Sequence, residues 1–273
     1  MYLLYYLSLR LLLKILTFTI PKGGVGKTLL QANVAAALAA SGKRVVVFDA
    51  DPTKAMETIL GVRTGSANLM QVMKKGQKLE EAMYETKVKN LYLLPSGLGL
   101  EAYLDLGTLE LAKKLDELDC DILIVDMAFP MGEAAFVALG ICHYLFMILT
   151  EDEFSLCVES GIDLVRLARH VFDCKPAGFV MNRITGEKVT DKLVGLVEKA
   201  FEAPCVVKIK EDPMVRKSYG GPNKREAYLF YERNPDGEFS NSIRTIAKFI
   251  EDLPDGKKKP LAVLDNIMKQ VKK

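Results

Sequence analysis

A glycine-rich turn between an apolar run and an alanine-rich run constrains the fold of this chain most strongly. Residues 14–20 read KILTFTI, residues 21–28 read PKGGVGKT, and an alanine-rich stretch follows. Glycines let successive backbone N–H groups point into one concavity, and a helix N-terminus adds partial positive charge. With Lys27 and Thr28 at the helix start, this strand, turn and helix predict a cradle for a phosphate group.

The rest of the chain alternates β-type and helical runs and has no Pro/Ser-rich linker. This alternation predicts an α/β fold: a doubly wound, mostly parallel sheet with helices on both faces. Near-continuous apolar runs such as 122–125 are typical of strands covered on both faces. Strands are expected at 14–20, 44–49, 91–94, 121–126, 144–150, 177–182 and 205–209. Helices are expected between them, for example at 28–40, 109–118, 153–169, 188–201 and 240–253.

Composition excludes several classes of protein. Of the 273 residues, 49% are hydrophobic and 26% are charged, which is ordinary globular usage and excludes a disordered, collagen-like or coiled-coil chain. The net charge of +2 gives the whole molecule no strong attraction to polyanions. Five scattered cysteines without a C-x-x-C pair predict reduced thiols in a cytoplasmic protein.

The two ends of the chain differ from its middle. Residues 1–13 are apolar except for Ser8 and Arg10, but this run is shorter than the ~20 residues that span a membrane. We predict an apolar N-terminal extension at 1–13, with a surface-lying amphiphilic helix as the alternative. The globular domain is expected at 14–254. A basic linker and an amphipathic C-terminal helix are expected at 255–273.

The C-terminal segment combines a basic leader with a two-faced helix. Residues 256–273 hold six lysines and one aspartate, and the apolar residues of 261–273 gather on one side of a helical wheel. Apolar area and lysines near anionic lipid are what an interfacial anchor needs. Residues 261–273 therefore predict an anionic-membrane contact. The alternative is a helix that docks its apolar face on the body.

The glycine turn departs from the ordinary P-loop pattern, because Pro21 takes the place of its first glycine and Lys22 is added inside the loop. The segment KGGVGKT resembles the deviant Walker A motif of the MinD/ParA family of P-loop ATPases. The resemblance implies ATP hydrolysis with ATP and Mg²⁺ bound, and an ATP-dependent homodimer. It makes Lys22 and Lys27 catalytic, with Lys22 reaching the partner's phosphates. Nucleotide contacts are expected from Gly23, Gly24, Val25, Gly26, Lys27, Thr28 and Leu29.

Carboxylates follow two other expected strands. Asp49 and Asp51 come at the end of one strand and Asp126 at the end of another. Two carboxylates at i and i+2 past a strand end can share one metal-and-water environment. By resemblance, Asp51 positions the attacking water, while Thr28, Asp49 and Asp126 serve the metal. The family's D-x-P-x-G pattern is not kept at 126–132, where Pro130 has no N–H to offer, so slow hydrolysis is expected.

The base of the nucleotide is expected further along the chain. Asn182 ends a β-type run and is followed by Arg183, as in the family, and an amide can donate and accept at once. Asn182 is therefore the candidate that reads adenine. The segment 207–216 resembles the family's region that flanks adenine.

The resemblance is closest to MinD-like proteins. It implies an ATP-dependent dimerisation switch with reversible membrane association in cell-division or intracellular positioning, hence a cytoplasmic, peripherally membrane-associated protein. An unknown protein partner would stimulate hydrolysis. The alternative is a ParA-type partitioning ATPase that binds non-specific DNA. A metal-cluster carrier, which the lack of C-x-x-C disfavours, and a non-hydrolysing regulator are further alternatives.

Overall fold

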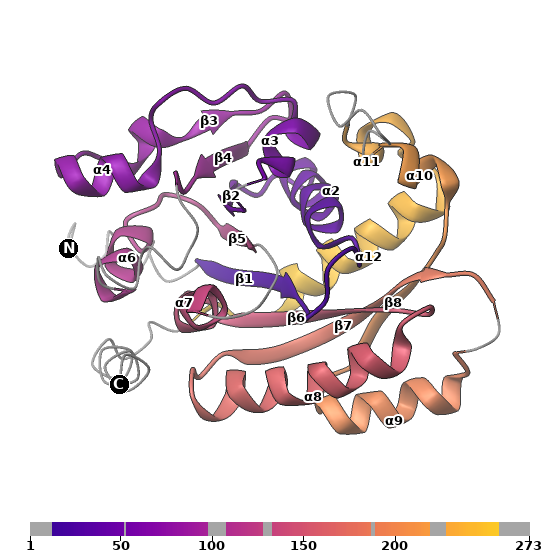
Figure 1. The fold of residues 1–273 in the computed structure, drawn as a ribbon. Coiled ribbons are helices and arrows are strands. Elements are labelled where there is room, and N and C mark those ends of the chain that lie inside the picture. Colours follow the sequence, from indigo (N-terminus) through magenta and orange to yellow (C-terminus); the bar gives the residue numbers. More distant parts are fainter. Residues whose placement is uncertain are drawn as a thin grey trace.

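The computed structural model describes residues 13–51, 53–97, 108–127, 133–186, 189–218 and 228–256. In these residues eight strands form one sheet in the order β3-β4-β2-β5-β1-β6-β7-β8 (Figure 1). All neighbouring strands are parallel except β3, which pairs antiparallel with β4. The strands are β1 Lys14–Thr19, β2 Val45–Ala50, β3 Tyr84–Glu85, β4 Leu91–Pro95, β5 Ile122–Met127, β6 Tyr144–Thr150, β7 Lys175–Ile184 and β8 Cys205–Lys210.

The predicted doubly wound fold is confirmed, and each of the seven predicted strands is present within about two residues of its expected ends. The helices are α2 Lys27–Ala40, α3 Ala55–Leu60, α4 Leu69–Lys75, the 3₁₀ helix η1 Leu79–Ala82, α6 Thr108–Leu115, α7 Glu133–Ile141, α8 Phe154–His170, α9 Asp191–Phe201, α10 Pro213–Ser218, α11 Phe230–Arg233 and α12 Glu238–Asp252.

The structure differs from the predictions at two helix boundaries and in one additional strand. The helix expected from residue 188 begins at Asp191, because the Thr190 hydroxyl accepts a hydrogen bond from Leu193 N at 3.3 Å and caps it. The helix expected over 109–118 ends at Leu115. Strand β3 was not predicted, since two residues carry no alternating pattern.

Helices cover both faces of the sheet. Figure 1 shows α2 and α12 on one face and α8 and α9 on the other. Small side chains let α2 lie close to the sheet, so that every residue from Leu30 to Ala39 is buried. The Phe18 and Phe146 rings stack at 4.8 Å, and Phe249 of α12 meets Phe146 edge-on at 6.1 Å. The fully buried rings of Phe18 and Phe146 each contribute ~1.5–3 kcal/mol of hydrophobic stabilisation.

The carboxyl ends of the central strands form the edge where a ligand is expected. Strand β1 lies between β5 and β6, and in such open sheets ligands bind outside the carboxyl ends where the strand order reverses. The register of β1 with β5 runs only to Leu16, opposite Ile124, whereas its register with β6 continues to Thr19. Strands β1 and β5 therefore separate before the glycine turn begins.

The last described residues are tied to the opposite edge of the sheet. Lys14 Nζ donates to the backbone oxygens of Ile250 and Glu251 at the end of α12, at 3.3 and 2.8 Å. The Tyr144 hydroxyl donates to Pro254 O at 2.6 Å. The predicted extension before Leu13, the tail 257–273 and the segment 128–132 lie outside the described residues. Among the described helices, none is long and apolar enough to cross a membrane.

Candidate functional site

The glycine turn adopts a conformation that needs glycine at two positions. Gly24 has φ 77° and Gly26, the N-cap of α2, has φ 93°, both in the left-handed region that side chains disfavour. A Cβ on Gly26 would lie 2.8 Å from Nδ2 of Asn182, which donates to Val25 O at 2.8 Å. Asn182, predicted to read adenine, thus supports the turn itself in this structure.

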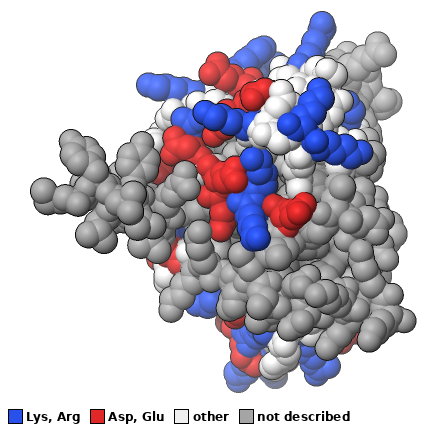
Figure 2. Space-filling model, turned by 90° about the vertical axis from the view of Figure 1, so that its left-hand side faces the viewer, with Lys and Arg blue, Asp and Glu red and all other residues white. Residues whose placement is uncertain are grey.

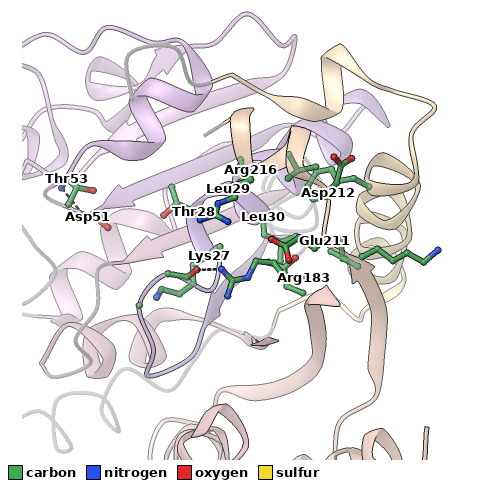
Figure 3. A pocket seen from close by; sticks show the side chains of 18 of the residues that line it. Lys27, Thr28, Leu29, Leu30, Asp51, Thr53, Arg183, Glu211, Asp212 and Arg216 are labelled. Carbon is green, nitrogen blue, oxygen red and sulfur yellow. Dashed lines mark hydrogen bonds between the residues drawn. The ribbon is translucent and has the colours of Figure 1, made fainter. Parts of the chain in front are cut away.

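A pocket of about 490 Å³ opens beside this turn. Figure 3 shows Asp51 and Thr53 toward one end, Lys27 and Thr28 between, and Arg183, Glu211 and Asp212 toward the other. Its walls come from the segments after β1, β2 and β8, from the ends of strands β5, β7 and β8, and from helices α2, α10 and α12. The lining residues are Gly23, Gly24, Gly26, Lys27, Thr28, Leu29, Leu30, Asp51, Thr53, Met127, Asn182, Arg183, Ile209, Lys210, Glu211, Asp212, Val215, Arg216 and Phe239.

The pocket brings together most of the residues that the sequence singled out. Lys22, Val25, Asp49 and Asp126 do not line it. Val25 is buried beneath the turn, and Asp49 and Asp126 are buried in the sheet. The segment 207–216, expected beside adenine, contributes six lining residues, from Ile209 to Arg216.

Buried carboxylates adjoin the pocket. Asp49 and Asp126 are register partners on β2 and β5. Burial, and then the charge of Asp126, raise the pKa of Asp49 to about 8, although Asp51 N donates to Asp49 Oδ1 at 3.0 Å. Burial raises the pKa of Asp126 to about 7, against the opposing effects of the Thr28 hydroxyl, Lys27 and Gln31. Two such carboxyls at one edge favour a cation or bound protons.

Lys27 has a half-buried ammonium that contacts the turn. Its Nζ donates to Lys22 O at 2.8 Å, across the concavity. Burial lowers the pKa of Lys27, while the charges of Asp126 and Asp51 oppose that shift. A phosphate oxygen in the pocket would offer this ammonium an anionic acceptor, which makes a stronger hydrogen bond than a carbonyl does.

The residues fit a Mg²⁺ ion that binds together with phosphates. Asp126 Oδ2 is buried and has no well-oriented hydrogen-bond partner among the described residues, although the Thr28 hydroxyl lies near enough to lower the pKa of Asp126. The described acidic, histidine and cysteine side chains form no group of three that could ligate a metal directly. Mg²⁺ usually keeps several waters and takes one or two protein ligands plus phosphates. The Thr28 hydroxyl and the carboxylates of Asp49 and Asp126 are groups of the kinds that can bind Mg²⁺ or its water molecules.

Three consecutive acids after β6 anchor the loops around the pocket, which sequence reasoning missed. Glu151 Oε2 accepts hydrogen bonds from Thr185 N at 2.6 Å and Gly186 N at 3.0 Å. The neighbouring carboxylate of Asp152 binds Arg183 through both oxygens, at 2.8 and 3.1 Å. The visible signal was an acidic run at the end of a buried strand.

Two further contacts reach the glycine turn, one from this acidic segment and one from Arg183. Glu153 pairs with Lys22 at 2.5 Å. Arg183, whose φ of 56° is unusual for a side-chain-bearing residue, also donates to Gly24 O at 3.4 Å, as Figure 3 shows. Lys22 therefore makes an ion pair within its own chain, where the resemblance had suggested a contact with a partner.

The site consists of a strand, a glycine turn and a helix, which open on a pocket with lysine, hydroxyl and carboxylate groups. This arrangement defines a nucleotide-binding protein of the P-loop class. Residues 16–221 match the family model of the CobQ/CobB/MinD/ParA nucleotide binding domain. The chain belongs to this family.

Individual relatives agree with that assignment. The chain is 28% identical over 253 residues to an uncharacterized ATP-binding protein of Methanocaldococcus jannaschii, covering 91% of this chain and 92% of that one. It is 27% identical to the chromosome-partitioning ATPase Soj of Treponema pallidum, with 70% and 86% covered. The solved septum site-determining protein MinD of Pyrococcus horikoshii, complexed with Mg-ADP, shares the fold with a TM-score of 0.72 and 20% identity, covering 88% and 96%.

Proposed function

We propose that this protein hydrolyses ATP and uses ATP-dependent dimerisation as a spatial switch. The observation that carries the proposal is the pocket itself, because it joins the glycine turn, Lys27 and Thr28 to Asp51 in one space. Family membership supports nucleotide binding independently. Hydrolysis, dimerisation and the switch are the steps that experiments have to test.

Binding is proposed to use the length of the pocket. The N–H groups of the glycine turn and the first turn of α2 hold the phosphates, and the Lys27 ammonium leaves Lys22 O to bind them. The base lies toward the end formed by Asn182, Arg183 and the segment from Ile209 to Asp212. A planar guanidinium can stack on a purine ring, and an amide can hydrogen-bond its edge.

Hydrolysis is proposed to depend on Asp51. This half-buried carboxylate lines the pocket, and its Oδ1 accepts from Thr53 N at 2.8 Å, which fixes its orientation. It would orient the attacking water by accepting its hydrogen bond. When bound, Mg²⁺ neutralises charge on the phosphate oxygens. The Thr28 hydroxyl would be its ligand, and Asp49 and Asp126 would hold its water molecules.

The dimer step is proposed to use Lys22. In the single chain its ammonium is paired with Glu153, at the amino end of α8. With ATP bound, a second copy would offer Lys22 phosphate oxygens across the interface. Dimerisation would then depend on the nucleotide, and hydrolysis would reverse it. An unidentified protein partner is proposed to accelerate that hydrolysis.

The membrane step is proposed to use residues 261–273. The chain reaches Gly256 at the edge of the sheet opposite the pocket, where Lys14 and Tyr144 hold residues 250–254. The last segment therefore starts away from the nucleotide. Two basic amphipathic segments on one dimer would bind anionic lipid more tightly than one, through avidity. We place the protein in the cytoplasm, peripherally membrane-associated in its ATP state.

A ParA-type partitioning ATPase that binds non-specific DNA is the second candidate. The similarity to the chromosome-partitioning ATPase Soj favours it. On the face shown in Figure 2, basic and acidic side chains of the described residues are interspersed, so this face offers no broad basic area there. A DNA site would need the other faces or residues outside the described ranges.

Co-sedimentation separates the two candidates. The full chain and a chain ending at Gly256 are each mixed with anionic liposomes or random duplex DNA, with ATP or ADP. ATP-dependent pelleting with lipid that truncation abolishes supports the membrane switch. Salt-sensitive, ATP-dependent DNA binding that truncation leaves unchanged supports the partitioning ATPase. If the full chain neither turns over ATP nor dimerises with it, both readings are wrong.

A further inference from the structure

We propose that Gln31 of α2 is the positioning residue that holds Asp126 in place for the Mg²⁺-dependent step. This role rests on the proposed function. Gln31 is fully buried, and its Nε2 donates to Asp126 Oδ1 at 2.5 Å. The two residues are 95 positions apart in the sequence. Neither the glycine-turn motif nor the pattern of carboxylates at strand ends predicts this contact.

Gln31 fills the gap that opens between β1 and β5. The register of these strands ends at Leu16, opposite Ile124. Beyond it, the Thr17 hydroxyl donates to Val125 O at 2.8 Å, and Phe18 N donates to Gln31 Oε1 at 3.4 Å. Side chains thus replace the backbone ladder here. The β1–β5 separation gives the Gln31 amide its position between a strand and a carboxylate.

The Phe18 contact fixes the orientation of the amide. A backbone N–H can only donate, so the Gln31 atom facing Phe18 is its oxygen, and the atom facing Asp126 is its NH₂ group. Asp126 is therefore held by a donor. A donor favours the carboxylate over the carboxylic acid and restricts its rotation. Asp126 Oδ2 is left for ordered water, since it has no well-oriented partner within the described part of the chain.

The surroundings make a purely space-filling role for this glutamine costly. The remaining buried positions of α2 are leucine, valine and alanine, apart from Asn33. A buried amide without hydrogen bonds is destabilising, and an apolar side chain would avoid that cost. Gln31 makes both of its bonds to groups at the site edge. These two hydrogen bonds, and not the filling of space, therefore explain a glutamine at this position.

One face of α2 carries Lys27, Thr28 and Gln31 together. Gln31 follows Thr28 by three residues and Lys27 by four, which places the three side chains on one side of the helix. Lys27 and Thr28 line the pocket. Gln31 lies one turn deeper and reaches Asp126. One rigid helix therefore sets the lysine, the hydroxyl and the carboxylate relative to one another.

The test measures how nucleotide affinity responds to Mg²⁺. Gln31→Leu removes both polar atoms and keeps the approximate volume, while Gln31→Glu keeps the shape and replaces the donor by an acceptor. Binding of a fluorescent ATP analogue is titrated in EDTA and then over a Mg²⁺ series at pH 8. We expect the affinity of each Gln31 variant for the ATP analogue in EDTA to stay within ~2-fold of wild type. The Mg²⁺ concentration that gives half of the maximal increase in affinity should rise ~10–100-fold, as for other residues that orient metal-site groups.

Asn33→Ala is the matched control. Asn33 is a buried amide on the same helix, but it bonds Leu29 O at 2.7 Å and Tyr231 N at 2.8 Å, not Asp126. It should lower the melting temperature without changing the Mg²⁺ response. Thermal melts identify a variant that fails to fold, in which case the other Gln31 variant gives the result.

The outcomes separate this role from the proposed function. Variants that fold and need the same Mg²⁺ concentration as wild type overturn the Gln31 assignment alone. A shift in Asn33→Ala equal to that of the Gln31 variants also overturns it, since the effect would then be general loosening of α2. If the nucleotide affinity of the wild-type chain does not depend on Mg²⁺, the proposed function is wrong, and so is the role of Gln31.

Discussion

Asp49 and Asp126 face each other in register at the carboxyl ends of β2 and β5, and both are almost wholly buried. Their backbones are fixed by the sheet, so the two side chains cannot move far apart without breaking strand pairing. Each carboxyl raises the cost of charging the other. The pair is therefore unfavourable in its doubly charged form until a cation is bound nearby.

This arrangement predicts that the ligand-free protein loses stability as pH rises. The folded pKa values of about 8 for Asp49 and about 7 for Asp126 exceed the ordinary value of 3.8, so the folded state binds more protons between these limits. Stability is then greatest below about pH 4 for these two groups and falls toward pH 8, by up to ~1.4 kcal/mol per pH unit for each. Chemical denaturation at several pH values in EDTA measures that slope.

Substitution of the pair tests the cause. Asp49→Asn should flatten the slope and make the ligand-free protein more stable than wild type at pH 8. Asp163→Asn is the control, because that side chain is 83% exposed on α8 and should not change the slope. An unchanged slope in Asp49→Asn would show that other groups cause the pH dependence.

The glycine turn and the strand-end positions of the three aspartates were predictable because their signals are local. Each aspartate ends or directly follows an apolar run, and parallel strands bring their carboxyl ends to one edge. The glycine turn needs only its own sequence to be recognised. The adjacency of Asp49 and Asp126 follows from the strand order, which the sequence pattern alone leaves open.

The contacts that tie these parts together were not predictable from one sequence. Gln31 stands in an apolar helical run, and its partner Asp126 is distant along the chain. Lys22 and Glu153 also belong to separate elements. Arg183 could be read only as a basic residue after Asn182. Such pairings depend on how helices are placed over the sheet, and periodicity carries no information about that.

Lys27→Ala should abolish tight nucleotide binding. The variant loses a half-buried ammonium that would make charge-assisted bonds to phosphate, each with ~1.5–3 kcal/mol, so affinity should fall by at least ~10–100-fold. Isothermal titration with ATP and Mg²⁺ measures the loss. Lys192→Ala, an exposed lysine on α9, should bind as wild type does. Normal affinity of the Lys27 variant would exclude the glycine turn as the phosphate site.

Gly26→Ala should be destabilising for two separable reasons. The φ of 93° is strained for alanine, at ~1–3 kcal/mol, and its Cβ would approach Asn182 Nδ2 at 2.8 Å. Asn182→Ala removes the second reason but not the first. Asn182→Ala also loses the hydrogen bond to Val25 O, so the double variant is compared with the single Asn182→Ala variant. We expect Gly26→Ala to lower the melting temperature less in that background than in wild type. No loss in that background would mean that backbone strain at Gly26 is negligible, and an equal loss would mean that the contact with Asn182 is negligible.

The Lys22–Glu153 ion pair should oppose dimerisation, because Lys22 has to leave Glu153 before it can bind a partner's phosphates. Both side chains are about one-third exposed, so the pair contributes no more than ~1 kcal/mol. Because two such pairs break in each dimer, Glu153→Gln should therefore tighten the ATP-dependent dimer by up to ~30-fold. Lys22→Ala should lose it. Sedimentation equilibrium with ATP in the Asp51→Ala background, where hydrolysis should be blocked, measures both constants.

Glu159→Gln is the matched control for this prediction, since it removes an exposed carboxylate further along α8 and should leave the dimer unchanged. A gain in Glu153→Gln that persists when Lys22 is also replaced would assign the effect to general loss of negative charge near the interface. A gain that needs Lys22 assigns it to the ion pair. Because the pair joins the glycine turn to α8, its release on dimerisation would connect nucleotide binding with the position of that helix.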